Sequence, residues 1–223
     1  MLRQDIMDAR DTIYELMPAA AGQMAEQELA QALRAGSQAA FNYLIAVYHQ
    51  PLYRLLYHLL QDSAEAADAV QDAYLKVFRS AGQFEGRCSV KTWLYRIAVH
   101  EAANHRRWWR RHKRRETSLD EPIREGIAWA ERLSSPQESP LAHAMREETR
   151  LRVEKILNGI PEPFRTTVVL RDLEDLSYEE IAQVTSAHLG TVKSRLVRGR
   201  EMVRRQLLQG EALKTDSPAR EAI

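Results

Sequence analysis

The sequence predicts an all-α fold: two small helical domains joined by a flexible linker, the C-terminal one a helix-turn-helix. From residue 25 to 112 Gly and Pro are scarce, and apolar residues recur every three to four positions, as on buried helix faces. Residues 116–148 lose this periodicity and contain several Pro and Ser residues. Helical spacing returns over residues 149–208, and the chain carries no strand signal. One interruption between two periodic stretches favours two domains.

The first domain is expected over residues 25–115, after an N-terminal extension, residues 1–24, whose periodicity is weak. Its first helical stretch covers residues 41–59. Pro51 falls inside that stretch and is expected to kink or restart the helix, because proline lacks an amide N–H.

Two further helices complete this domain. One is expected over residues 64–80, followed by a Gly-containing loop at 81–90. The next helix packs Trp93 in the core and continues into the basic segment 106–115. The residues expected to be buried on the helix at 64–80 are Ala66, Val70, Ala73, Tyr74, Val77 and Phe78.

The second domain is expected over residues 149–208, after an acidic linker at 116–148. Its helix near 151–157 should end at Gly159, a usual stop signal, and Pro161 with Pro163 can begin the next helix. Residues 209–223 are small and polar and are expected to form a disordered tail.

A helix-turn-helix is the most specific local pattern. Ser177 and Glu180 have the spacing of a capping box, and a short break at 186–188 precedes a helix that starts near Leu189. Such a helix suits the major groove of DNA; the alternative is an amphipathic surface helix with basic residues near its C-terminal end. Its expected buried residues are Val192, Leu196, Val203 and Leu207, and its exposed ones are Lys193, Ser194, Val197, Arg198, Glu201 and Arg205.

The net charge of +1 conceals a strong segregation of basic and acidic residues along the chain. Residues 106–115 hold seven Lys and Arg and no acid, residues 116–148 hold eight acids against three bases, and residues 193–205 hold six bases and one acid. A single basic run is usually a solvated helix face. Two separate runs, each ending a helical pattern, favour contact with nucleic acid.

Composition excludes several other classes. The apolar fraction of 44% and charged fraction of 28% are ordinary for a globular protein, and no apolar run suits a membrane span or signal peptide. The lone Cys88 excludes an internal disulfide, and the seven His residues lack partners at metal-ligand spacing. No phosphate-cradling Gly loop or nucleophile elbow is present. The sequence therefore predicts a cytoplasmic protein with no metal, cofactor, small-molecule substrate or enzymatic activity.

Three motifs together resemble a known family. D-A-V-Q-D at residues 68–72 precedes A-Y-L-K-V-F, and F-E-G-R-C-S-V-K-T-W-L-Y-R-I-A follows at 84–98. These segments resemble region two of the extracytoplasmic-function sigma factors of bacterial RNA polymerase. L-S-Y-E-E-I-A and G-T-V-K-S-R-L, within residues 176–196, are similar to region four of the same family. The resemblance covers about residues 28–112 and 149–208.

The resemblance implies a sigma factor that binds core RNA polymerase and directs promoter recognition, melting and transcription initiation, with an anti-sigma factor as a further partner. It implies that Asp68, Gln71 and Asp72 contact the polymerase clamp. The residues it assigns to the melted minus-ten strand are Ser80, Phe84, Arg96 and His100 for the base, and Arg106, Arg107, Arg110 and Arg111 for phosphates. Those it assigns to the minus-thirty-five duplex are Lys193, Ser194, Arg195, Val197 and Arg198.

The sequence departs from the family pattern at four positions. His100 stands where many relatives have Asn, which puts the preferred minus-ten base in question. Asp175 and Ser186 stand where glycine is common, and His188 where proline is common. The main alternative is a free-standing helix-turn-helix regulator that uses only the C-terminal domain; an RNA-binding or enzymatic role for the basic Trp108–Trp109 segment is a third.

Overall fold

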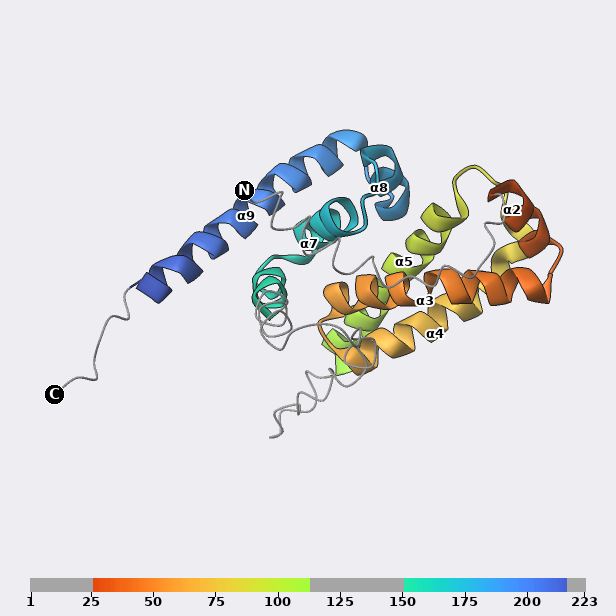
Figure 1. Ribbon diagram of the computed structural model, residues 1–223, viewed down its shortest axis with the longest axis horizontal. Helices are drawn as coiled ribbons and strands as arrows, with labels where there is room; N and C mark the ends of the chain where they lie inside the picture. The colour runs from red at the N-terminus through yellow and green to blue at the C-terminus, as the bar shows by residue number, and fades with distance from the viewer. Residues whose placement is uncertain (1–25, 113–150, 216–223) are drawn as a thin grey trace, which may run out of the picture.

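The computed structural model describes residues 26–112 and 151–215, with side chains as far as Leu208. These two ranges are called the N-terminal unit and the C-terminal unit. All elements in them are helical, as the sequence predicts (Figure 1). The N-terminal unit contains α2 (Glu26–Arg34), α3 (Gln38–Leu60), α4 (Ser63–Ser80), the 3-10 turn η1 (Ala81–Gln83) and α5 (Val90–His112). The C-terminal unit contains a helix at 151–158, α7 (Glu162–Val168), the π-helical turn η4 (Val169–Leu173), α8 (Tyr178–Thr185) and α9 (Leu189–Thr215).

Local capping sets the helix boundaries of the N-terminal unit. Gly36 has φ +73° between α2 and α3, and the Ser37 hydroxyl caps α3 by accepting from the Ala40 amide. Asp62 caps α4 in the same way, through a 2.9 Å hydrogen bond from the Glu65 amide. Side-chain caps satisfy amides that the first helical turn leaves unpaired.

Pro51 does not restart α3. The helix is continuous from Gln38 to Leu60, so the predicted restart was wrong. Buried leucines lie on both sides of the proline, including Leu44 and Leu52, and their packing holds the helix together across the missing amide. Both halves of α3 therefore pack on the core of the N-terminal unit.

The C-terminal unit confirms the predicted helix-turn-helix. Ser177 and Glu180 form the expected capping box at the start of α8, with hydrogen bonds of 3.1 and 2.8 Å. Ser186 ends α8 in a left-handed conformation, and α9 begins at Leu189. Pro161 is the N-terminal cap of α7, as its position predicts.

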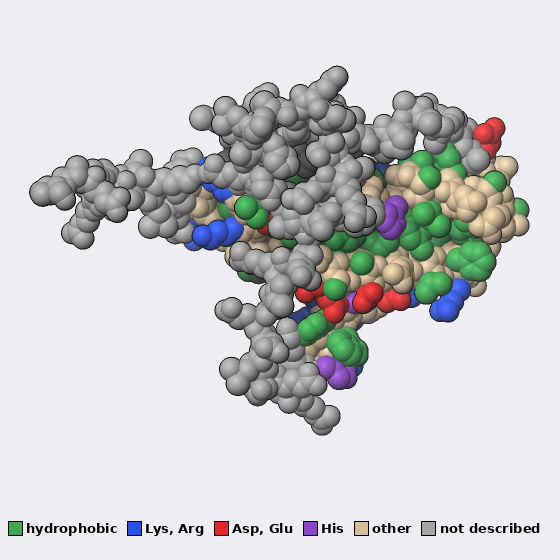
Figure 2. Space-filling model, turned by 60° about the horizontal axis from the view of Figure 1, so that its bottom comes forward, with side chains coloured by type: hydrophobic (Ala, Val, Ile, Leu, Met, Phe, Trp, Pro, Cys, Tyr) green, Lys and Arg blue, Asp and Glu red, His purple; other side chains and the backbone are tan. Residues whose placement is uncertain are grey.

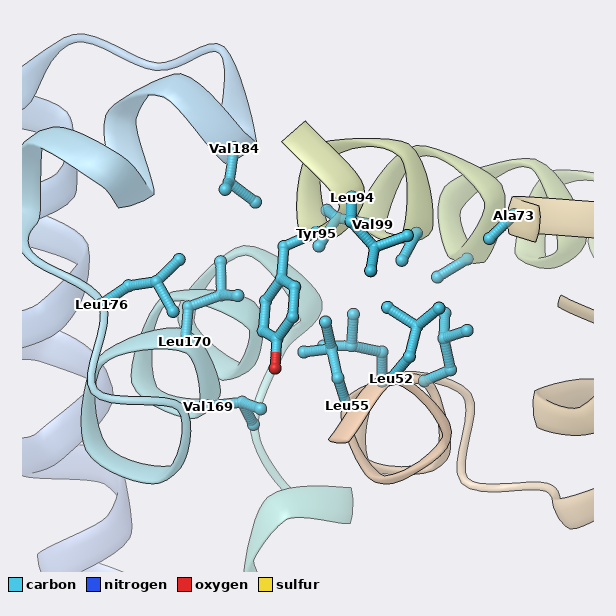
Figure 3. Packing of buried hydrophobic residues seen from close by; sticks show 14 of the residues in the cluster. Leu52, Leu55, Ala73, Leu94, Tyr95, Val99, Val169, Leu170, Leu176 and Val184 are labelled. Atoms are coloured by element: carbon cyan, nitrogen blue, oxygen red, sulfur yellow. The ribbon is translucent and has the colours of Figure 1, made fainter. Parts of the chain in front are cut away.

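The two units share one hydrophobic core. α8 packs against α5, and α7 and η4 contact α3. Figure 3 shows the ring of Tyr95, from α5, between Leu170 and Val169 of the C-terminal unit and Leu55 of α3. All four side chains are fully buried. The units are therefore packed together in this structure and not separated.

Two expectations about helix faces and ends were wrong. Phe78 was predicted to be buried on the second helix, but 63% of it is exposed, and it contacts the Phe41 ring at 5.0 Å between centroids. Residues 209–215 belong to α9, so that part of the predicted tail is helical. Apart from Gly210, this segment consists mainly of good helix formers (Gln, Glu, Ala, Leu and Lys), and no proline interrupts it.

The predicted extension at 1–24, the linker at 116–148 and the end of the tail lie outside the described residues. Within residues 26–112 and 151–215, no helix has both the length and the apolar character that crossing a bilayer requires.

Candidate polymerase and DNA interfaces

One face of α4 carries the residues assigned to polymerase. Asp68, Gln71 and Asp72 are all exposed, and their spacing of three to four places them on one side of the helix. Leu75 and Phe78 are exposed further along the same helix. In Figure 2, where the lower side of Figure 1 comes forward, acidic side chains gather in a row beside apolar and basic ones. Large apolar side chains exposed next to acidic ones are typical of a protein-binding surface.

A cleft of about 530 Å³ lies between α4 and the C-terminal half of α5, and Asp68 and Asp72 line it. His105 of α5 lies at its wall and bridges two carboxylates of α4: Nδ1 lies 2.9 Å from Glu65 Oε2, and Nε2 lies 3.0 Å from Asp72 Oδ2. The Trp109 indole also donates to Glu65. One of the two Trp residues in the basic segment thus packs on the N-terminal unit, while Trp108 is 53% exposed. Sequence reasoning did not single out His105 or Glu65 as a pair, because they are 40 residues apart.

The residues assigned to the flipped minus-ten base are only partly brought together. Arg96 and His100 are exposed on α5 and lie four residues apart, on the same face. Ser80 ends α4, with its hydroxyl donating to the Lys76 carbonyl at 2.7 Å. Phe84 differs from the expectation: it is 5% exposed and packs on Trp93, with ring centroids 4.7 Å apart. Its ring belongs to the core in this structure, because the apolar wall of Trp93 covers it.

Arg106 also differs from the other basic residues of α5. Its guanidinium is largely buried, donates to the Leu59 carbonyl at 3.2 Å and forms an ion pair with Glu162 of the C-terminal unit at 2.7 Å. In this arrangement Glu162 pairs with the guanidinium, so contact of Arg106 with phosphate stays a prediction that requires this ion pair to open. Arg107, Arg110 and Arg111 are exposed, as phosphate contact requires.

The start of α9 presents the side chains assigned to duplex DNA. Lys193, Ser194 and Arg198 are exposed, and Val197 is 70% exposed, unusually for an apolar residue. Arg195 is half-buried. The opposite face is buried, as predicted, through Val192, Leu196 and Val203, with Leu207 partly buried. The helix thus separates a core face from a cationic face that is accessible to a duplex.

A groove of about 320 Å³ runs between the two units and collects residues from both candidate DNA surfaces. Arg96 and His100 of α5 line it on one side, and Arg195 of α9 lines it on the other. Glu162 of α7 also borders the groove. Arg96 and His100, the residues assigned to the minus-ten base, therefore face the C-terminal unit across this groove.

Besides the Arg106–Glu162 ion pair, three hydrogen bonds between described residues join the two units, and all three start from α5. Tyr95 donates to Glu174 Oε2 at 2.6 Å, Lys91 donates to the Glu174 carbonyl at 3.1 Å, and Thr92 donates to Glu180 at 3.2 Å. Glu174 is 3% exposed. Burial raises the pKa of its carboxyl, although the Tyr95 hydroxyl, Arg54 and Lys91 oppose the rise. Sequence analysis missed Tyr95 and Glu174, which are 79 residues apart and carry no shared local signal.

Comparison with protein families matches both halves of the chain. Residues 44–115 match the family model described as Sigma-70 region 2, and residues 150–203 match Sigma-70, region 4. The solved structure of CnrH in complex with the cytosolic domain of CnrY superposes with a TM-score of 0.59 at 20% identity, over 87% of this chain and 100% of that one. The sigma factor RpoE from Bartonella quintana, in complex with the anti-sigma factor NepR, gives 0.55 at 22% identity, over 75% and 96%. These two likenesses support the fold.

Curated relatives are more similar in sequence. The RNA polymerase sigma-H factor of Pseudomonas aeruginosa is 35% identical over 184 residues, which cover 82% of this chain and 93% of the relative. The ECF RNA polymerase sigma-E factor of Escherichia coli K12 is also 35% identical, over 81% of this chain and 93% of the relative. Both relatives match across the two helical units, which does not favour a regulator built on the C-terminal unit alone. The chain therefore belongs to the extracytoplasmic-function sigma factors of bacterial RNA polymerase.

Proposed function

We propose that this sigma factor docks on core RNA polymerase through the exposed face of α4 and recognises promoters through α5 and the start of α9. The observation that carries the proposal is the placement of three separate surfaces on two units that match regions two and four. One surface is acidic and apolar, and the other two are cationic. A protein that joins a polymerase to two DNA segments needs one surface for the polymerase and one for each DNA segment.

Docking rests on Asp68, Gln71 and Asp72, with Leu75 and Phe78 as the apolar part of the same surface. Acidic side chains steer a basic partner toward the interface, and buried apolar side chains contribute most of the affinity. The partner is core RNA polymerase, named from the family, and its clamp is the expected site of contact.

Promoter melting rests on α5. A base that leaves the stack needs a polar pocket and a cationic surface along the strand. Ser80, Arg96 and His100 are proposed for the pocket, with Phe84 supporting it from the core. Arg107, Arg110 and Arg111 are proposed for the phosphates, and Arg106 joins them only if its ion pair with Glu162 opens.

Duplex recognition rests on the first turns of α9. Lys193 and Arg198 are proposed to hold phosphates or base edges, and Ser194 and Val197 to meet base edges in the major groove. Arg195 is proposed as a phosphate contact at the rim of this surface.

We further propose that the protein acts in the cytoplasm, catalyses no reaction and is held inactive by an anti-sigma factor. Polymerase supplies the chemistry of transcription, so the sigma factor needs only binding surfaces. The groove between the units, with Arg96 and Arg195 on opposite sides, is a suitable place for such an inhibitor to lie.

Run-off transcription with purified core polymerase tests the function. The full chain plus core should yield promoter-dependent transcripts from a pool of genomic fragments, while core alone should not. Absence of any such product would contradict the proposal. Dimerisation with tight duplex binding in the absence of polymerase would instead support the regulator alternative.

Two sets of variants test the surfaces separately. Asp68→Lys should weaken binding to core roughly tenfold or more, because it places like charge against a basic partner. Glu28→Lys, an equally exposed reversal on α2, is the matched control.

On α9, the pair Lys193→Ala and Arg198→Ala should abolish recognition of the minus-thirty-five duplex and leave assembly with core intact. Arg204→Ala removes one positive charge further along the same helix and should have little effect. Unchanged promoter recognition in the double variant would refute the assignment of α9.

A further inference from the structure

We propose that His105 is a positioning residue: its imidazolium fixes the Asp72 carboxylate in the orientation that polymerase docking uses, and ties the docking helix α4 to the DNA-binding helix α5. This inference rests on the proposed docking role of α4 and adds to it a residue of α5. It follows from the geometry of the cleft between the two helices.

Both ring nitrogens of His105 meet carboxylate oxygens. Nδ1 faces Glu65 Oε2 at 2.9 Å and Nε2 faces Asp72 Oδ2 at 3.0 Å. A neutral imidazole has one N–H and can donate to only one acceptor, whereas the imidazolium donates to two. The two contacts together therefore require the protonated ring.

The charged groups around His105 favour the protonated form of its ring. Glu65, Asp68 and Asp72 of α4 and Glu101 of α5 line the cleft, against Arg111 from the C-terminal turns of α5. Lys76 of α4 pairs with Glu101 at the other side. Burial lowers the pKa of His105, but the hydrogen bonds and charges of Glu65 and Asp72 outweigh it and raise the pKa above the ordinary 6.5.

The bridge orders the docking surface at two points. Glu65 is also held by the Trp109 indole, so the α5 side chains fix that carboxylate from two directions. Asp72, 53% exposed at its side chain, is held through Oδ2 and remains accessible to a partner. Glu65 and Asp72 are two helical turns apart, so His105 fastens that length of α4 to α5.

The ring affects docking in two opposite ways. Its positive charge lies 3.0 Å from Asp72 Oδ2 and weakens the acidic field of α4 there. Fixing the rotamer of Asp72 removes an ordering cost that a free side chain meets on binding. We expect the ordering effect to prevail.

Three variants of the full chain test the inference by titration against purified core polymerase at about pH 6.5. His105→Phe keeps a ring but removes both donors, and should lower affinity roughly tenfold, the order expected for lost hydrogen bonds to charged groups. His105→Arg keeps a permanent cation in an open cleft and should retain most of the affinity. His112→Gln alters an exposed histidine on the same helix and should bind as the unaltered chain does.

The pH profile separates positioning from packing. Affinity of the unaltered chain should fall as the pH rises above the ordinary value of 6.5 and through the raised pKa of His105, because the bridge requires the protonated ring. His105→Arg should remove that part of the fall, and the His112→Gln profile should match the unaltered one. Titration of the His105 ring by NMR should give a lower pKa in Asp72→Asn.

The outcomes distinguish this inference from the proposed function. If the unaltered chain fails to bind core at any pH, the docking proposal itself is refuted. If it binds but His105→Phe keeps its affinity and pH profile, or binds more tightly, the positioning role of His105 is refuted while docking by α4 stands. Loss of affinity in both His105→Phe and His105→Arg, with unchanged pH dependence, would also refute it.

Discussion

At the scale of single residues, the turns of the C-terminal unit place two side chains where glycine is favoured. Asp175 has φ +57° and Ser186 has φ +51°, both in the left-handed region. This conformation brings Cβ close to the following carbonyl in any residue other than glycine. Glycine at either position would therefore be free of this strain.

Replacing Ser186 by glycine should stabilise the protein. The change relieves left-handed strain of about 1 kcal/mol or more, and is partly offset by the larger entropy loss of glycine on folding, leaving a gain of roughly 0.5–1 kcal/mol. Urea unfolding of the full chain measures it as a higher midpoint at constant slope. Ser186→Ala has no such relief and is the matched control; an equal gain there would contradict the explanation.

The buried carboxyl of Glu174 should make stability depend on pH. Its pKa is raised in the folded state, so the stability that its protonated form contributes is complete below the ordinary value of 4.5 and is lost as pH rises through the raised pKa. Glu174→Gln stays neutral, so its melting temperature relative to the unaltered chain should increase from pH 5 to pH 8. Glu179→Gln changes an exposed carboxyl nearby and should show no such trend.

Phe84 and Arg106 show that residue type alone does not predict which side chains are exposed to DNA. Both were assigned to DNA by family position, yet Trp93 covers Phe84 and Glu162 pairs with Arg106. Exposure depends on which element packs opposite, and that partner lies far away in the sequence. Lys193, Ser194 and Arg198 could be placed on the exposed face in advance because helical periodicity alone settles it.

At the scale of elements, helix ends are set by short-range capping. The box at the start of α8 lies within four residues, so its spacing is visible in the sequence and is confirmed in the structure. The same holds for the proline at the start of α7 and for the break before α9. The π-helical turn over Val169–Leu173 has no such signature, and it was not predicted.

Removing the cap of α8 should destabilise the C-terminal unit. Ser177→Ala leaves the Glu180 amide without its side-chain acceptor and should reduce the free energy of unfolding by about 1 kcal/mol. Ser177→Thr keeps the hydroxyl and should lose far less. Chemical denaturation of both variants tests this, and an equal loss in the two would contradict a capping role for the hydroxyl.

At the scale of the whole molecule, the two units are packed together, and the sequence did not predict this. Each domain could be derived from periodicity, but the contact between them depends on Tyr95, Glu174 and Val169, whose meeting no local pattern encodes. The fold class was therefore predictable, and the arrangement of the units was not.

Loosening this contact should affect the two DNA surfaces unequally. Tyr95→Phe leaves the Glu174 carboxylate without a donor, which costs roughly 1–3 kcal/mol in a buried site. Arg96 and His100 are exposed but border the groove between the units, where the C-terminal unit limits the approach of a DNA strand, whereas Lys193 and Arg198 do not line that groove. Affinity for single-stranded minus-ten DNA should therefore rise several-fold, and affinity for the minus-thirty-five duplex should not change.

Fluorescence anisotropy with the two DNA probes measures this difference, and Tyr43→Phe on α3 is the control. An equal change for both probes, or none for either, would contradict a role for the contact in limiting access to this part of α5.

The common core also constrains how the chain can diversify. Val169 and Leu170 are covered by Tyr95 and Leu55, so each half supplies part of the interior of the other. A lesion on one side can be compensated by a change on the other, and genetic suppressors of Tyr95 substitutions are expected in the C-terminal half. Substitutions in the cores of the two halves are therefore expected to be correlated, although the halves contact different DNA elements.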